Sequence, residues 1–110
     1  MFKNKISIVT ISFNQSKFLE ECINSVIRQN YENLEYIVVD GGSKDNSREI
    51  ISKYKDQIKV IFQETNTGPA DALNLGFKIS KGPSWISLTP SSGQIVKIYY
   101  KPGKYLNASL

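Results

Sequence analysis

The feature that most constrains this chain is a regular alternation of short apolar runs with longer segments of helical periodicity. The apolar runs are residues 5–11, 34–40, 58–63 and 85–88. Each run is rich in β-branched residues and short, as expected of a strand covered on both faces. The helical segments between them are residues 16–29, 45–55 and 69–81. Strands that alternate with helices form right-handed βαβ units, so the sequence predicts an α/β fold with a Rossmann-like parallel sheet and flanking helices.

The clearest helical stripe lies between residues 16 and 29. It consists of Phe18, Leu19, Cys22, Ile23, Val26 and Ile27. This spacing places all six side chains on one face of a helix. Cys22, the only cysteine of the chain, is therefore predicted to be a core residue, and no internal disulfide is possible.

Composition excludes several classes of function. The 110 residues include no histidine, which excludes serine–histidine and cysteine–histidine catalysis and zinc sites that need imidazole. The net charge is +4, but the first 82 residues hold eleven basic and ten acidic residues, interspersed. The excess lies in the last 28 residues, which carry three lysines and no acid. This distribution does not indicate a nucleic-acid-binding surface.

Neither a membrane span nor a secretion signal is predicted. No apolar run approaches the length that crosses a bilayer. Residues 1–5 lead directly into a strand-like segment without the apolar stretch of a signal peptide. We expect a cytoplasmic protein, and peripheral attachment at the inner face of the membrane is compatible with this expectation.

Ligands of open α/β sheets bind outside the carboxyl ends of the strands. Ser12 and Asn14 follow the first predicted strand, where the glycine triplet of a dinucleotide-binding site and the P-loop are both absent. Asp40 ends the second strand and is followed by Gly41 and Gly42. A buried carboxylate costs free energy unless it is paired. It accepts hydrogen bonds either from loop amides as a helix cap or from the N–H or hydroxyl groups of a ligand. The two glycines fit a ligand site and a tight turn alike.

The loop after the third strand ends at Gly68, where a helix begins with Pro69. Helix N-termini favour anions. Asp71 lies in the first turn of this helix, where a carboxylate is stabilised even without a ligand. Both a structural role and a ligand contact remain open for Asp71.

Four segments, in this order and spacing, resemble glycosyltransferase family 2. They are SIVTISFN (7–14), LEECINSV (19–26), YIVVDGGSKDNS (36–47) and NTGPADALNLG (66–76). The resemblance covers residues 6–82. It implies a GT-A fold that binds a nucleotide-diphosphate sugar, most often UDP-linked, with Mg²⁺ or Mn²⁺, and that makes polysaccharide or cell-surface glycans.

The resemblance also implies roles for particular residues. The loop from Thr10 to Asn14 would line the nucleoside pocket, Asp40 would accept a hydrogen bond from the base, and residues 68–74 would close the far side. The predicted nucleotide-binding residues are Thr10, Ser12, Asn14, Asp40, Gly41, Gly42, Gly68 and Asp71.

The sequence departs from the family after the fourth predicted strand. There the family places a D-x-D-like motif whose carboxylates hold the metal, but this chain continues as Thr89-Pro90-Ser91 and has no acidic residue after Asp71. No metal ligand and no catalytic residue is therefore predicted. We predict that residues 1–88 form a partial GT-A domain that binds the nucleotide-sugar and that residues 89–110 form an atypical basic tail.

The resulting hypothesis is a glycosyltransferase by descent, inverting if complete, with this chain truncated and inactive alone. A truncation or frameshift around residues 83–89, a non-catalytic relative and an erroneous gene end would each explain the departure. The alternative function is a non-catalytic, nucleotide-binding Rossmann-like module. A third is an interaction fragment that forms a homo-oligomer through an exposed sheet edge. A receiver domain phosphorylated at Asp40 is disfavoured because Ser12 and Asn14 stand where further acids are needed.

Overall fold

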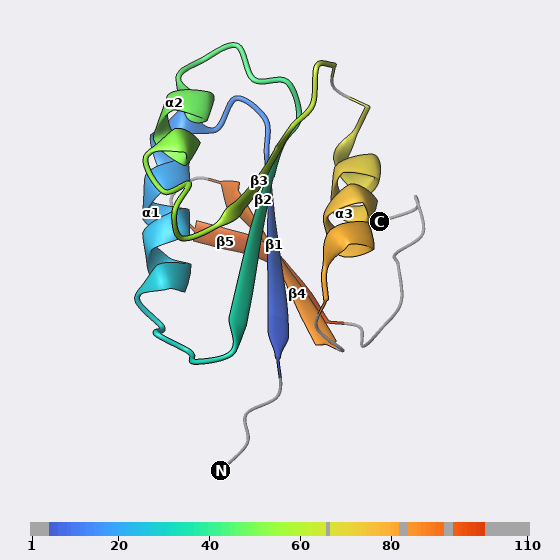
Figure 1. Ribbon diagram of the computed structural model, residues 1–110. Coiled ribbons are helices and arrows are strands. Elements are labelled where there is room, and N and C mark those ends of the chain that lie inside the picture. The colour runs from blue at the N-terminus through green and yellow to red at the C-terminus, as the bar shows by residue number, and fades with distance from the viewer. Residues whose placement is uncertain (1–4, 66, 82–83, 92–93, 101–110) are drawn as a thin grey trace.

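A computed structural model describes residues 5–65, 67–81, 84–91 and 94–100 of the chain. These residues form a five-stranded sheet with helices on both faces (Figure 1). The strands are β1 (Ile6–Ser12), β2 (Leu34–Asp40), β3 (Lys59–Phe62), β4 (Ser84–Ser91) and β5 (Gln94–Tyr100). The helices are α1 (Ser16–Ile27), α2 (Ser47–Ser52) and α3 (Pro69–Ile79).

The strand order in the sheet is β3-β2-β1-β4-β5. β1 pairs in parallel with β2 and β4, and β2 pairs in parallel with β3, which confirms the predicted parallel sheet. β5 runs antiparallel to β4 and was not predicted. Its β-branched and aromatic residues favour a strand, and two strands so close in sequence pair readily in an antiparallel hairpin. The predicted boundary after residue 88 falls inside β4.

The three helices are shorter than predicted, α2 most of all. The side chain of Asp45 accepts a hydrogen bond from the Ser47 amide (2.9 Å), so Asp45 precedes the helix. Beyond Ser52, the amides of Lys53 and Tyr54 bond to carbonyls three residues back, which ends the α-helical pattern. No helix in the described part of the chain is long and apolar enough to span a membrane.

Alternate residues of the parallel strands supply two cores, one on each face of the sheet. On one face, β2 packs against α1 and α2, which lie side by side on the left in Figure 1. On the other face, β1 and β2 pack against α3. The residues fully buried between these layers include Leu19, Ile23, Val38, Ile51, Val9, Ile37, Val39 and Leu73. Cys22 is buried beside the first of these cores, as its place on the helical stripe predicts.

Gly76 sets the distance between α3 and the sheet. A Cβ at this position would lie 2.6 Å from Cγ1 of Val9 and 3.4 Å from Cγ2 of Val39. Real side chains do not approach so closely, so the helix would have to move away. The glycine therefore lets α3 lie directly on β1 and β2.

Candidate functional site

The carboxyl ends of β1, β2 and β3 lie side by side at the upper edge of the sheet in Figure 1. Ser12 is opposite Asp40, and Asp40 is opposite Phe62. Main-chain hydrogen bonds continue past the strands, from the Gly41 amide to Ser12 O (2.8 Å) and from the Gln63 amide to Asp40 O (2.9 Å). Three strand ends are thus held in register, with Asp40 in the middle.

The carboxylate of Asp40 has no solvent-exposed surface. Its Oδ2 accepts hydrogen bonds from the amides of Gly42 (3.1 Å) and Ser43 (2.9 Å), and its Oδ1 accepts one from the Ser43 hydroxyl (2.5 Å). Gly42 has a φ of +96°, a conformation that glycine adopts without strain. The glycine therefore turns the loop back over the carboxylate.

Arg48 supplies the positive charge beside Asp40. Its Nε donates to Oδ2 of Asp40 (3.1 Å), and its Nη2 donates to the main-chain oxygen of Gln63. The guanidinium carbon lies 5.0 Å from the centre of the Phe62 ring, a cation–π distance. Arg48 thus bridges the ends of β2 and β3, while 37% of its side chain remains exposed.

Asn14 fastens the loop after β1 to the loop after β2. Its amide donates to the Ser43 hydroxyl oxygen (2.8 Å), and its side-chain oxygen accepts from the Lys44 amide (2.8 Å). Its φ of +53° is uncommon for a residue other than glycine, although asparagine tolerates it better than most. Asp45 adds a second link by accepting from the Ser16 amide (3.1 Å). Burial opposes its charged form, but hydrogen bonds from Ser47 and Ser16 lower the pKa of Asp45 to about 2.

The side chain of Thr10 lies in the core and not at this edge. It is fully buried, and its hydroxyl is 2.8 Å from the hydroxyl of Tyr36 and 4.0 Å from Sγ of Cys22. Burial raises the pKa values of both Tyr36 and Cys22, so these groups stay neutral. Ser12, in contrast, is buried at the edge itself, and its hydroxyl has no hydrogen-bond partner among the described residues.

The third predicted part of the site is the start of α3. Gly68 has a φ of +101° and immediately precedes the helix, and Asp71 lies exposed in its first turn. Asn74, one turn further along, has a side-chain oxygen without a partner among the described residues. The structure thus places Asp71 on a different element from Asp40, and no hydrogen bond links the two in the described part of the chain.

Arg48, Ser43 and Phe62 were not among the predicted site residues. A signal for Arg48 was present in the sequence. A buried carboxylate needs a cation, and Lys44 and Arg48 are the basic residues within ten positions of Asp40. Arg48 lies in the first turn of α2, from which its side chain reaches back to the strand end. Phe62 gave no such signal, because its contact depends on the pairing of β3 with β2.

The residues present do not fit a site for a divalent cation. Among the described residues, no three aspartate, glutamate, cysteine or histidine side chains gather closely enough to hold a metal ion. The sequence offers no acid after Asp71. Hard divalent cations require several oxygen ligands, carboxylates above all.

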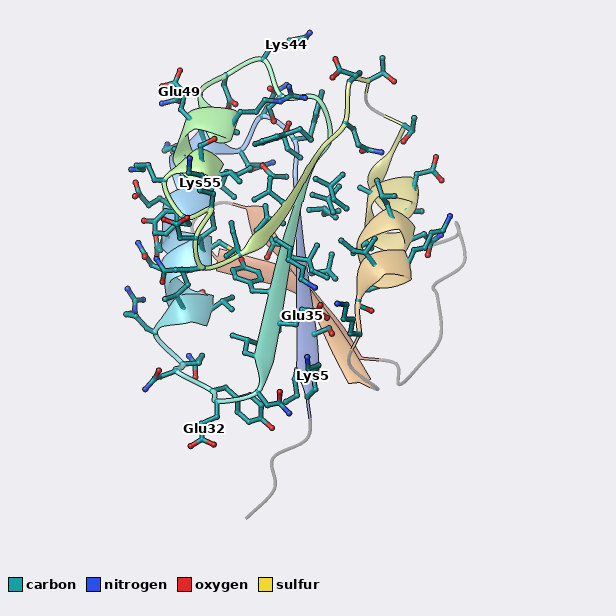
Figure 2. All side chains as sticks on the ribbon, in the orientation of Figure 1. Lys5, Glu32, Glu35, Lys44, Glu49 and Lys55 are labelled. Atoms are coloured by element: carbon teal, nitrogen blue, oxygen red, sulfur yellow. The ribbon has the colours of Figure 1, made fainter. Side chains whose placement is uncertain are left out.

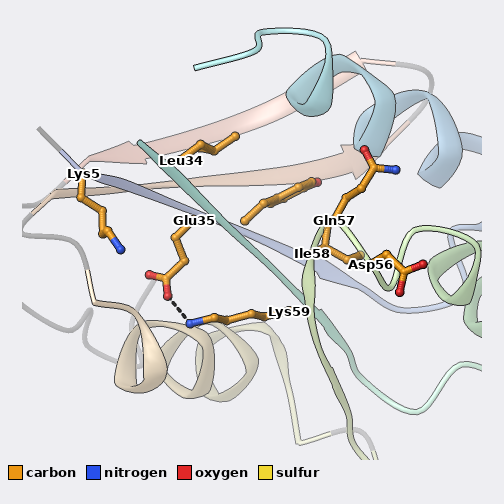
Figure 3. Close-up of a pocket in the computed structure, with 8 residues that line it drawn as sticks. Lys5, Leu34, Glu35, Asp56, Gln57, Ile58 and Lys59 are labelled. Carbon is orange, nitrogen blue, oxygen red and sulfur yellow. Dashed lines mark hydrogen bonds and ion pairs between the residues drawn. The ribbon is translucent and has the colours of Figure 1, made fainter. Parts of the chain in front are cut away.

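A hollow of about 310 Å³ lies at the opposite, amino end of the sheet, around Glu35 (Figure 3). Figure 2 shows Glu35 and Lys5 at this end, whereas Lys44 lies at the other. Glu35 Oε1 accepts from the Ser7 hydroxyl (2.7 Å) and the Lys81 amide (2.7 Å), and Oε2 accepts from Nζ of Lys59 (2.5 Å). These bonds join β1, β2, β3 and the segment after α3. We interpret the cluster as a structural clamp.

The charge state of Glu35 follows from these contacts. Burial disfavours its ionised form, but the hydrogen bonds from Lys59, Lys81 and Ser7 outweigh burial and hold the pKa of Glu35 below its ordinary value of 4.5. Glu35 is therefore ionised at neutral pH.

Comparison with known proteins identifies the family of the chain. Residues 7–89 match the sequence profile of Glycosyl transferase family 2. The chain belongs to this family. The match confirms the resemblance of the four sequence segments, and it includes β1 to β3 and the loops after them.

Relatives from bacteria support the assignment. Glycosyltransferase GlyG of Streptococcus pneumoniae serotype 4 is 40% identical over 95 residues, which are 84% of this chain and 31% of the relative. A glycosyltransferase of Nostoc is 40% identical over 82 residues, covering 71% of this chain and 25% of the relative. The family 2 chain described here thus spans between a quarter and a third of the length of these relatives.

Solved glycosyltransferase structures share the fold. TarS 1–349 of Staphylococcus aureus in complex with UDP-GlcNAc is 30% identical and superposes with a TM-score of 0.73, over 77% of this chain and 26% of that one. The mannosyltransferase PcManGT of Pyrobaculum calidifontis, in complex with GDP-Man and Mn²⁺, is 19% identical with a TM-score of 0.74, over 80% of this chain and 28% of that one. The second likeness concerns the fold alone. Together they confirm the GT-A architecture.

Proposed function

We propose that this family 2 chain provides the nucleotide-binding part of a glycosyltransferase that moves a sugar from a UDP-sugar to a glycan or lipid-linked acceptor. The observation that carries the proposal is the set of three adjacent strand ends around Asp40, each followed by a loop that can reach a ligand. The TarS structures with UDP and UDP-GlcNAc support the choice of nucleotide. The proposed setting is the cytoplasm, at or near the inner membrane face.

Asp40 is the proposed acceptor for a base N–H. Its Oδ2 already accepts three hydrogen bonds, whereas Oδ1 accepts one. A carboxylate oxygen has room for a second donor. Because Asp40 is fully buried beneath its hydrogen bonds to Gly42 and Ser43, the loop after β2 must move to admit the base.

The surroundings of Asp40 suit a flat, polar-edged ligand. Phe13 and Phe62 are 41% and 40% exposed, which is unusual for such large apolar residues, and their rings offer surfaces for stacking. Ser12, whose hydroxyl has no partner in the described part of the chain, adds a polar contact, and Gly41 and Gly42 let a ligand approach the main chain. Gly68 and Asp71 would close the far side, and Asn14 would hold the two loops together.

Binding by the 110-residue chain should be weak, because the carboxylates that would hold a metal against the diphosphate are absent. The test is an NMR titration of the ¹⁵N-labelled chain with UDP. Shifts concentrated in the amides of residues 12–14, 40–43 and 67–71 support the site. Shifts around Glu35, or none at millimolar UDP, contradict it.

The alternative is a module that binds the nucleotide without chemistry. The absence of any acid after Asp71 favours it for this chain in isolation, because neither a metal clamp nor a carboxylate base is available. We expect no nucleotide release when the chain is incubated with UDP- and GDP-sugars and Mn²⁺. Glu64, in the loop after β3, and Asp71 are the acids that could replace the missing metal ligands. Metal-dependent turnover that disappears on changing either residue would overturn that expectation.

We also propose that the chain can form a homo-oligomer through a sheet edge. β3 and β5 are the outermost strands of the described sheet, and an edge strand can pair with another chain. Sedimentation of the chain at several concentrations measures it.

A further inference from the structure

The loop after β2 lies over Asp40 and carries no apolar side chain. Its residues 42–45, here called the cover loop, are Gly-Ser-Lys-Asp. Gly42 and Ser43 are buried and donate three hydrogen bonds to the Asp40 carboxylate. Because the cover loop has no apolar side chain to bury, hydrogen bonds are its main attachment. Segments with few buried apolar contacts open at a lower free energy than the core does.

Three further hydrogen bonds join the cover loop to the segment after β1. Asn14 forms two of them, from its amide to the Ser43 hydroxyl (2.8 Å) and from the Lys44 amide to its own Oδ1 (2.8 Å). The third runs from the Ser16 amide to Oδ2 of Asp45 (3.1 Å). The bonds to Lys44 and Asp45 are exposed, so water competes for the same groups. Figure 2 shows Lys44 at the outer end of this loop.

The main chain on both sides of this junction favours movement. The Gly41 amide stays bonded to Ser12 O, so the chain turns away from the sheet at Gly42, whose φ is +96°. Asn14 has a φ of +53°, a conformation that persists in residues other than glycine where neighbouring contacts hold it. Breaking the Asn14 hydrogen bonds lets its main chain relax, which offsets part of the cost of opening.

We propose that the cover loop opens as a unit, that Asn14 holds it closed in the ligand-free chain, and that a nucleotide reaches Asp40 in the open form. In the closed form the Ser43 hydroxyl occupies Oδ1 of Asp40, so the loop and a base N–H compete for the same acceptor. The inference rests on the proposed function for the identity of the ligand. Opening itself is a property of the chain alone and can be measured without a nucleotide.

The first experiment is amide hydrogen exchange, followed by NMR, in four ligand-free proteins. These are the unchanged chain, Asn14→Ala, Asn14→Asp and the control Ser25→Ala. Asn14→Ala removes the acceptor for the Lys44 amide and tolerates a positive φ less well, whereas Asn14→Asp keeps an acceptor oxygen. Ser25→Ala removes a comparable bond between side chain and main chain, to Cys22 O (2.7 Å), away from the loop.

The amides of Gly42 and Ser43 should exchange through an opening that depends little on low concentrations of urea, because it exposes little surface. Their exchange should be about tenfold faster in Asn14→Ala, and within about twofold of the unchanged chain in the other two variants. If these amides exchange with the same urea dependence as the core amide of Val38, the loop opens when the whole chain unfolds and the inference is wrong.

The second experiment is a titration of the same proteins with UDP. When the open form alone binds, the apparent affinity is proportional to the open fraction. Asn14→Ala should therefore bind UDP about tenfold more tightly than the unchanged chain, although it has lost a hydrogen bond, and Ser25→Ala should bind as the unchanged chain does. Weaker binding by Asn14→Ala would show that the closed loop favours the nucleotide, which contradicts the inference.

The two experiments separate the inference from the proposed function. If UDP binds at the carboxyl edge and Asn14→Ala weakens it, the proposed function stands and the inference fails. If neither the unchanged chain nor Asn14→Ala binds UDP, the proposed function fails, and hydrogen exchange alone decides whether the cover loop opens.

Discussion

Two buried carboxylates lie at opposite ends of β2, and they differ in what surrounds them. Glu35, at the amino end, accepts hydrogen bonds that join three strands to the segment after α3. Asp40, at the carboxyl end, is bonded within its own loop and to Arg48. Exposed Phe62 and the Ser12 hydroxyl, which has no partner among the described residues, lie on the neighbouring strands. Both carboxylates are buried, and each forms an ion pair with a basic side chain. The position of Asp40 at the carboxyl ends of the strands, and the unpartnered Ser12 hydroxyl among the described residues there, distinguish the proposed ligand site from the clamp.

Removing Asp40 should have the largest effect on stability. In Asp40→Ala, the guanidinium of Arg48 and the amides of Gly42 and Ser43 lose their common acceptor in a buried place. We expect the free energy of unfolding to fall by about 3 kcal/mol. Urea denaturation measures it. A loss below about 1 kcal/mol would show that the loop does not depend on this carboxylate.

Removing Glu35 should cost less, about 2 kcal/mol in Glu35→Ala. The side chain of Lys59 is 45% exposed and can turn to water when its partner is lost, whereas Arg48 is fastened at three points. The same denaturation experiment ranks the two changes. The opposite order would mean that the amino-end clamp, and not the Asp40 loop, holds the sheet together.

Gly76→Ala changes the packing of α3 against β1 and β2 and contacts neither Glu35 nor Asp40. The added Cβ would lie 2.6 Å from Cγ1 of Val9 in a closely packed core. We expect a loss of about 1.5 kcal/mol through overpacking. The comparison variant is Ala72→Gly, at a buried position on the same helix. It loses one methyl group and helix propensity but adds no atom to the core. A neutral or stabilising Gly76→Ala would contradict the close approach.

The smallest expected effect is the contribution of Glu35 to the pH dependence of the free energy of unfolding. The folded-state pKa of Glu35 is lowered, so its ionised form stabilises the fold above the ordinary pKa of 4.5, and this stabilisation is lost as pH falls through the lowered value. The stability difference between the unchanged chain and Glu35→Gln should therefore be full at pH 7 and shrink below about pH 4.5. Denaturation curves at pH 7, 5 and 3.5 test this. A difference that grows towards acid pH would mean the pKa is raised.

The sequence predicted most of the fold because its information is local. The β-branched runs and the helical stripe around Leu19 and Ile23 specify strands and a helix without reference to distant residues. β5 was not predicted, although the β-branched and aromatic residues of Gln94–Tyr100 favour a strand. The length of α2 was overestimated because its start depends on a hydrogen bond from Ser47 to Asp45, and its end on a change in hydrogen-bonding pattern after Ser52.

The positions of the proposed site residues along the strands were predictable, whereas their contacts were not. Asp40, Gly42 and Gly68 follow from their places after strands or before a helix. Whether a side chain points to the edge or into the core depends on the strand register. Thr10 and Ser12 lie on the same face of β1. Thr10 contacts Tyr36 and Cys22 in the core, whereas Ser12 lies at the end of the strand, opposite Asp40. The bridge of Arg48 to β3 depends on tertiary pairing that no local pattern reveals.

The most direct test of the contrast between the two ends of β2 is the dissociation constant for UDP in the unchanged chain, Asp40→Asn and Glu35→Gln. Each change replaces one buried carboxylate by an amide of the same shape. We predict that Asp40→Asn weakens UDP by at least about tenfold, as the loss of a hydrogen bond to a charged group implies, whereas Glu35→Gln changes it less than about twofold. Equal affinities in all three proteins, or a loss confined to Glu35→Gln, would contradict the assignment of the carboxyl edge as the nucleotide site.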